Sequence, residues 1–216
     1  MLVALIGPSG AGKSTLMRML TTICDYSILR VVTTRPPRGK EIDRMSVSES
    51  EFARMKRSGA FLWTNSAFGY NYGIPRRLLH SLHSVQPTYF MDPALEDLHE
   101  ISRLPGHKVG FIILPPSWNE LARRLVEKGR SDRLKEVRCQ YERYEAVIAN
   151  GTPELIDNRI VINESAEKAA QIIYLTVDSL QDQLLREART PIHNNNKIAI
   201  LGQFDALQVA TYDALQ

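Results

Sequence analysis

The stretch "LVALIGPSGAGKSTL", residues 2–16, joins an apolar run to a glycine-rich turn that ends in lysine and serine. Residues 2–6 are uninterrupted apolar, as expected of a strand buried on both faces of a parallel sheet. Residues 7–14 fit the pattern G-x-x-x-x-G-K-[S/T], and residues 13–23 are predicted to form a helix. Because this pattern requires a preceding strand and a following helix, the sequence predicts a phosphate-binding loop, or P-loop.

The residue types of this loop suit a nucleoside triphosphate. Glycines let successive backbone N–H groups point into one concave space, and the positive end of the following helix adds to the attraction. Lys13 places a charge between the terminal phosphates, and the Ser14 hydroxyl can ligate Mg²⁺. We therefore expect ATP as the phosphoryl donor and Mg²⁺ as the cofactor. The predicted ATP-binding residues of the loop are Gly7, Pro8, Ser9, Gly10, Ala11, Gly12, Lys13, Ser14 and Thr15.

The rest of the chain alternates strands with helices, which is typical of a parallel sheet covered on both faces. Further strands are expected at residues 27–33, 88–92, 109–114 and 159–163, and a hairpin-like pair at 60–72. Ser48 and Ser117 each open a capping box, so helices are expected after them. Pro75 is expected to start another helix, and residues 165–187 to form a closing one.

Composition excludes several classes of function. The 216 residues suffice for one domain with an appendage, and a net charge of +3 is too small to indicate nucleic acid or a membrane surface as a partner. No apolar run approaches the roughly 20 residues needed to cross a bilayer. The two cysteines have no metal-like spacing, which favours a reduced, cytoplasmic compartment. We expect a monomer or a homodimer without nucleic-acid or membrane partners.

Five segments together resemble the guanylate kinases: "GPSGAGKSTL" at the start, "TTRPPRGKE" at 33–41, "YG" at 72–73, "FIILPPSWNELARRL" at 111–125 and "VIN" at 161–163. The resemblance covers about residues 1–178. It implies the three-layer α/β fold of P-loop NTPases, with a central parallel sheet, a small acceptor-binding insertion and a helical lid. The kinase domain would span residues 1–187, with the acceptor-binding subdomain at about 34–86 and the lid at about 123–145. Residues 188–216 would form a C-terminal tail of unknown role.

The resemblance also implies which residues bind the acceptor. Arg35 and Arg38 match the two arginines that hold the acceptor phosphate, and guanidinium forks suit a phosphate because they bind it bidentately. Glu41 and Tyr72 match an acid and a tyrosine of the same site. The alternative for these residues is a solvated surface loop. Asp92 ends an apolar strand on the ligand side of such a sheet, where it either orients Mg²⁺ or the acceptor, or caps a helix before Pro93.

For the lid, the resemblance implies phosphate contacts from the basic residues that follow Arg123. We select Arg124, Arg130 and Arg138 as catalytic residues together with Lys13, the alternative being a solvated helix face. Asn163 matches an asparagine near the adenine pocket of the family, and a structural role in a turn is the alternative.

The sequence departs from the family where the acceptor base would bind. Trp63 stands in place of the acid that reads guanine, Ile74 in place of a serine or threonine, and Val31 in place of a serine. The tyrosine of a D-Y-x-F segment has no counterpart, because Arg44 or Met45 falls there.

The predicted reaction is phosphorylation of a nucleoside monophosphate by ATP, with GMP or dGMP converted to GDP or dGDP. One alternative is another acceptor, either a different (deoxy)nucleotide or ribose 1,5-bisphosphate. The other is a non-catalytic protein-binding module, against which the intact P-loop argues.

Overall fold

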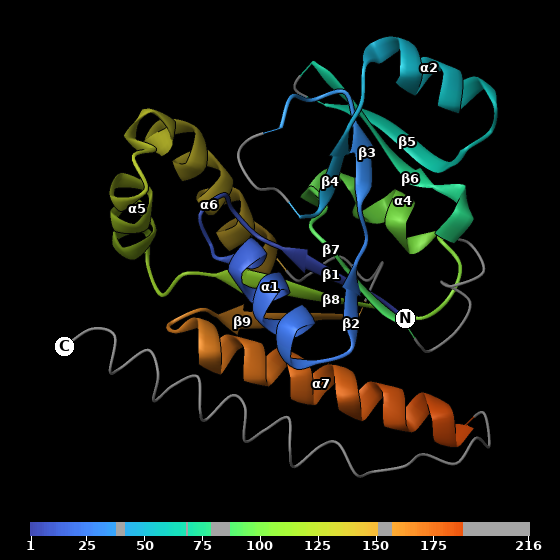
Figure 1. Ribbon diagram of the computed structural model, residues 1–216. Coiled ribbons are helices and arrows are strands. Elements are labelled where there is room, and N and C mark those ends of the chain that lie inside the picture. Colours follow the sequence, from blue (N-terminus) through green and yellow to red (C-terminus); the bar gives the residue numbers. More distant parts are fainter. Residues whose placement is uncertain (38–41, 68, 79–86, 151–156, 188–216) are drawn as a thin grey trace.

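Five parallel strands form the central sheet of the computed structural model, which describes residues 1–37, 42–67, 69–78, 87–150 and 157–187 (Figure 1). Their order is β2-β7-β1-β8-β9. The central strand β1 (Leu2–Ile6) pairs with β7 (Thr88–Met91) and β8 (Lys108–Leu114), and the edges are β2 (Tyr26–Ile28) and β9 (Asp157–Ile162). Every side chain of β1 is at most 1% exposed, which confirms the doubly buried strand predicted from its apolar run.

Helices cover both faces of this sheet, so the predicted three-layer α/β architecture is confirmed (Figure 1). Alternate residues of β1 point to opposite faces. Val3 and Leu5 pack with α1 (Lys13–Ile23) and α7 (Ala166–Glu187). Leu2, Ala4 and Ile6 pack with α4 (Leu98–Ser102) and with α6 (Leu134–Ala149). Among the described helices, none is long and apolar enough to span a membrane.

A second, four-stranded sheet has the order β4-β3-β6-β5. Its strands are β3 (Val31–Thr33), β4 (Arg44–Ser46), β5 (Phe61–Ala67) and β6 (Tyr70–Pro75), the last two forming the expected hairpin. Helix α2 (Glu49–Arg57) covers one face of it, and the Ser48 hydroxyl accepts a hydrogen bond from the Glu51 N–H at 3.2 Å, as its capping box predicts. We refer to this unit as the small sheet.

One expectation about the elements was wrong. Residues 27–33 were expected to form one strand, but β2 joins the central sheet and β3 the small sheet. The Leu29 N–H still bonds the Phe90 carbonyl of the central sheet, whereas the Val31 N–H bonds the Asp43 carbonyl beside β4. Pro75 is the last residue of β6 and the 3₁₀ turn η1 (Arg76–Leu78) follows it, while the rest of the helix expected after Pro75 lies outside the described residues. The polar stretch after Thr34 contains the strand β4, which sequence periodicity did not indicate.

The segment predicted as the lid is a pair of helices. Ser117 caps α5 (Trp118–Glu127) by accepting from the Glu120 N–H at 3.2 Å, as predicted. Gly129, at φ 65°, ends this helix. The 3₁₀ turn η3 (Ser131–Arg133) then leads into α6. Figure 1 shows α5 and α6 to the left of the small sheet, with the loop between β1 and α1 beside α6.

Candidate active site

The P-loop is built from backbone groups that leave no room for side chains at its glycines. Gly12 has φ 102°, and a Cβ there would lie 2.3 Å from Asn163 Nδ2. A Cβ on Gly7 would lie 2.2 Å from the Ile113 carbonyl oxygen. Lys13 is 8% exposed, and its ammonium donates to the carbonyls of Gly7 and Pro8 at 2.6 and 3.1 Å. The lysine is therefore held inside the loop that it is predicted to serve.

Asn163 fixes the loop from the neighbouring strand end. Its side-chain amide donates to the Ala11 carbonyl at 2.7 Å, and it is only 3% exposed. Its own carbonyl accepts from Arg124 Nη2 at 2.9 Å. Asn163 thus makes contacts that hold the structure together, while its contact with adenine stays a prediction. Ser14 and Thr15 lie in the first turn of α1, and both side chains are exposed.

Asp92 lies at the end of β7 beside the P-loop. Its carboxylate is 3.6 Å from Lys13 Nζ, and no helix begins at Pro93, since the next helical turn, η2 (Leu95–Asp97), has Ala94 at its N-cap. Burial raises the pKa of Asp92 above its usual value, and the Lys13 charge opposes that rise. The placement at the carboxyl end of a parallel strand is the one predicted, on the ligand side of the sheet.

A cleft of about 860 Å³ runs between the P-loop, the small sheet and α6. Lys13 and Arg35, both predicted to bind phosphate, line this cleft, and Tyr72 lines it from β6. Arg35 is 8% exposed, with its backbone N–H bonded to Thr33 Oγ1 at 3.1 Å and its carbonyl to Ser46 Oγ at 2.8 Å. The structure therefore places in one cleft a residue that the sequence assigned to ATP binding and two that it assigned to acceptor binding. Arg38 and Glu41 lie outside the described residues.

The residues at which the sequence departs from the family do not all face the cleft. Trp63 and Val31 line the cleft. Ile74 is 0% exposed and packs in the core between the two sheets, so it does not face an acceptor. Arg44 also lines the cleft, and its guanidinium carbon lies 5.9 Å from the centre of the Tyr72 ring.

Arg133 is the lid residue that the sequence did not single out. Its Nη1 donates to Ser9 Oγ at 3.0 Å, while Nη2 bonds Glu136 at 2.7 Å. Gln140, one turn further along α6, accepts from the Ser9 N–H at 3.0 Å. The sequence signal was the basic cluster itself, but seven cations within residues 123–138 do not indicate which of them face the P-loop.

The three lid arginines selected from the sequence lie differently. Arg124 is 18% exposed in its side chain and bonds both Glu120 and the Asn163 carbonyl, beside the P-loop. Arg130 is exposed, with its backbone N–H bonded to the Leu125 carbonyl. Arg138 lies over the Trp118 ring at 4.9 Å and bonds Glu142. None of the three selected arginines lines the cleft.

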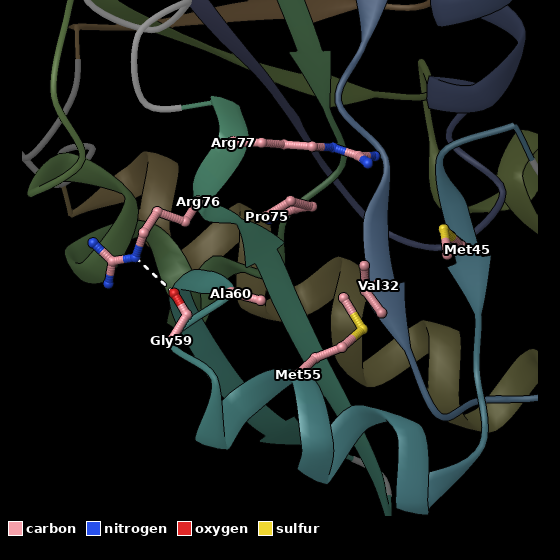
Figure 2. Close-up of a pocket in the computed structure, with 8 residues that line it drawn as sticks. All are labelled: Val32, Met45, Met55, Gly59, Ala60, Pro75, Arg76 and Arg77. Carbon is pink, nitrogen blue, oxygen red and sulfur yellow. Dashed lines mark hydrogen bonds between the residues drawn. The ribbon is translucent and has the colours of Figure 1, made fainter.

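A separate pocket of about 500 Å³ lies on the other face of the small sheet, beside α2 (Figure 2). Its lining is mainly apolar and includes Val32, Met45 and Met55. Figure 2 shows Arg76 turned back to the Gly59 carbonyl, to which its Nε donates at 2.8 Å. None of the residues predicted to bind phosphate lines this pocket, so the cleft is the candidate active site.

Comparison with known proteins gives consistent results. The family described as "Guanylate kinase" has a sequence model that matches residues 1–187. A guanylate kinase from Polaromonas sp. is 32% identical over 178 residues, which cover 78% of this chain and 82% of the relative. A guanylate kinase from Thermosynechococcus vestitus is 35% identical over 173 residues, covering 78% and 88%. The crystal structure of guanylate kinase from Anaplasma phagocytophilum superposes with a TM-score of 0.58 at 25% identity, covering 90% of this chain and 97% of that one.

Proposed function

The chain belongs to the guanylate kinase family, and from this premise we propose that it transfers the γ-phosphoryl group of ATP to GMP or dGMP, giving ADP and GDP or dGDP. The observation that carries the proposal is the single cleft shared by Lys13, Arg35 and Tyr72. A donor cradle and an acceptor-phosphate clamp that open into one space allow direct transfer between two nucleotides, without a covalent enzyme intermediate.

On the donor side, Lys13 exchanges its bonds to the Gly7 and Pro8 carbonyls for the oxygens of the terminal phosphates of ATP. The P-loop N–H groups and the start of α1 add a field that favours negative charge. Phosphoryl transfer depends mainly on positioning and on charge neutralisation, which these groups supply.

On the acceptor side, Arg35 holds the attacking phosphate, and Tyr72 contacts it from the adjacent strand. The buried backbone bonds of Arg35 to Thr33 and Ser46 fix the position from which its guanidinium extends. We retain Arg38, Glu41 and Asp92 as further acceptor-binding residues. Asp92, held 3.6 Å from Lys13, lies between the two sides.

The lid completes the charge balance. Arg133, bonded to Ser9, is already at the P-loop, and Arg124 reaches the same region through Asn163. We propose that Arg130 and Arg138 join them when α5 and α6 move over the bound nucleotides. Such closure excludes water and suppresses hydrolysis of ATP.

Mg²⁺ is the cofactor that this chemistry calls for. It prefers oxygen ligands and usually keeps several waters while it bridges phosphates. The exposed Ser14 hydroxyl at the start of α1 fits that preference, and the Asp92 carboxylate is near enough to Lys13 to act through water. No cluster of three metal-binding side chains occurs in the described part of the chain, in keeping with an ion held largely by phosphates. When bound, Mg²⁺ would neutralise charge on the phosphates.

A second acceptor is favoured by one observation, the replacement of the guanine-reading acid by Trp63, which lines the cleft. On that view the acceptor is another nucleotide or ribose 1,5-bisphosphate. A non-catalytic binding module would have little use for an intact P-loop with its lysine in place.

We also propose that the enzyme is cytoplasmic, as a monomer or homodimer. The two free cysteines, Cys24 and Cys139, suit a reduced compartment.

An acceptor panel tests the proposal. ADP release is measured with ATP, Mg²⁺ and each of GMP, dGMP, AMP, UMP, dTMP and ribose 1,5-bisphosphate. We expect GMP and dGMP to give the highest kcat/KM. Turnover of another acceptor while both guanine nucleotides are inert would overturn the assignment. Calorimetry with ATP·Mg²⁺ separates a kinase from a binding module, because the module would take up no nucleotide.

A further inference from the structure

The carboxylates that line the cleft differ in their partners. Four of them lie next to cations: Asp43 is 3.2 Å from Arg44, Asp92 is 3.6 Å from Lys13, Glu136 is 2.7 Å from Arg133, and Glu96 pairs with Arg143. The fifth, Asp97, is bonded to a neutral amide, because Asn65 Nδ2 donates to its Oδ1 at 2.6 Å. Among the described carboxylates of the cleft, Asp97 is therefore the one placed to receive hydrogen bonds from an uncharged ligand.

The surroundings of Asp97 suit a flat, apolar ring with polar edges. Leu95, Ile101 and Trp63 line the same cleft and belong to one apolar cluster. Burial raises the pKa of the Asp97 carboxyl, and the hydrogen bond from Asn65 opposes this. A carboxylate in such a setting gains from a ligand that donates N–H groups to it, because few water molecules compete.

Asn65 holds Asp97 in a defined orientation. Its Oδ1 accepts from the Ser66 N–H at 2.6 Å, so the amide nitrogen of the same side chain is directed at Asp97. Asn65 follows Trp63 by two residues on β5 and thus projects from the same face of the strand. The two elements that meet here, β5 and η2, are separate from the P-loop.

We propose that Asp97 is the residue that recognises the acceptor base, and that Asn65 is its positioning residue. The proposal rests on the proposed function and names its specificity determinant. Guanine presents two donors side by side, N1–H and the 2-amino group, which match the two oxygens of one carboxylate. Adenine presents an unprotonated N1 at that edge and is rejected. A carboxylate from η2 thereby takes over the task that the sequence position of Trp63 no longer performs.

The test changes hydrogen-bonding groups both on the protein and on the acceptor base. In Asp97→Asn, one carboxylate oxygen becomes an NH₂ donor, which faces the guanine 2-amino group but complements the C2 carbonyl of xanthine. We expect kcat/KM for GMP to fall on the order of 10²-fold and XMP to become the better acceptor. The matched control is Glu96→Gln, which removes a charge one residue away and should keep the preference for GMP over XMP.

Two further measurements keep the test decisive. In wild-type protein, IMP and 1-methyl-GMP each lack one donor and should be poorer acceptors than GMP by at least tenfold. Asn65→Ala should raise KM for GMP with little change in kcat or in KM for ATP, whereas a merely structural loss would lower all activity. Unfolding curves and KM for ATP report whether each variant is folded.

The outcomes separate the two proposals. If wild-type protein does not phosphorylate guanine nucleotides, the proposed function fails, whatever Asp97 does. If wild-type protein uses GMP and Asp97→Asn keeps its preference for GMP over XMP, the role of Asp97 is refuted and the function stands. Equal use of GMP, IMP and 1-methyl-GMP by wild-type protein would likewise refute it.

Discussion

The P-loop and the acceptor side of the cleft are built on different principles. The P-loop uses backbone N–H and carbonyl groups, closed around Lys13 and held at the Ala11 carbonyl by Asn163. The acceptor side uses side chains from separate strands and turns, such as Tyr72, Arg35 and Asp97. A backbone site tolerates almost no change, because a single Cβ collides. A side-chain site can move a function from one element to another while the fold stays the same.

The largest effect is expected from removing the charge of the P-loop. Lys13→Ala should lower kcat by at least 10²–10³-fold, the usual cost of losing one preorganised charge donor, while the protein stays folded. Coupled ADP release and a circular dichroism spectrum measure the two properties. Lys168→Ala, which changes an exposed lysine of α7, should behave like wild type. Full activity of Lys13→Ala would refute the assignment of the donor site.

A pair of glycine substitutions compares the P-loop with the turn after α2, which does not line the cleft. Gly12→Ala, at φ 102° with Asn163 Nδ2 2.3 Å from the new Cβ, should cost roughly 2–4 kcal/mol of folding stability and weaken ATP binding. Gly59→Ala, at φ 69° with nothing within 4 Å, should cost only about 1 kcal/mol and leave ATP binding unchanged. Urea unfolding and calorimetry measure both. Equal costs at the two glycines would contradict the claim that the P-loop has no room for a Cβ.

The smallest effect concerns the connection between the lid and the P-loop. Arg123 and Arg124 lower the pKa of Glu120 to about 2, and Arg124 continues to the Asn163 carbonyl. Because the pKa is depressed in the folded state, this carboxylate stabilises the fold above its ordinary pKa of 4.5 and loses that contribution as pH falls toward about 2.

Glu120→Gln should therefore lower Tm slightly at pH 7, and the difference from wild type should shrink as the pH falls below 4.5. Glu127→Gln is the control, since Glu127 is exposed and contacts only the outer Arg123 among these arginines. Thermal unfolding across this pH range makes the measurement. A difference that grows on acidification would contradict the assigned sign.

The sequence predicts the P-loop better than the acceptor side of the cleft, because local patterns determine the first and contacts between distant segments determine the second. The central strands, α1 and both serine-capped helices follow from local patterns, because a buried strand, a glycine loop and a capping box each depend on neighbouring residues. The break between β2 and β3 depends on two partners elsewhere in the chain, the Phe90 carbonyl for Leu29 and the Asp43 carbonyl for Val31, so residues 27–33 gave no local sign of it. Arg133 and Asp97 depend on how α6 and η2 are placed, which one-dimensional spacing does not encode. Ile74 is the opposite case, because the sequence suggested that it lies where the acceptor base binds and the structure places it in the core.

The folded-back position of Lys13 has a consequence for turnover. The lysine is bonded to two backbone carbonyls and lies beside Asp92, so the protein itself supplies partners for its charge. Nucleotide entry then swaps one set of oxygen partners for another, and departure of ADP returns the lysine to the first set. Affinity for the product is moderated by this competition, which favours rapid release in a reaction whose slow step is often the exit of product.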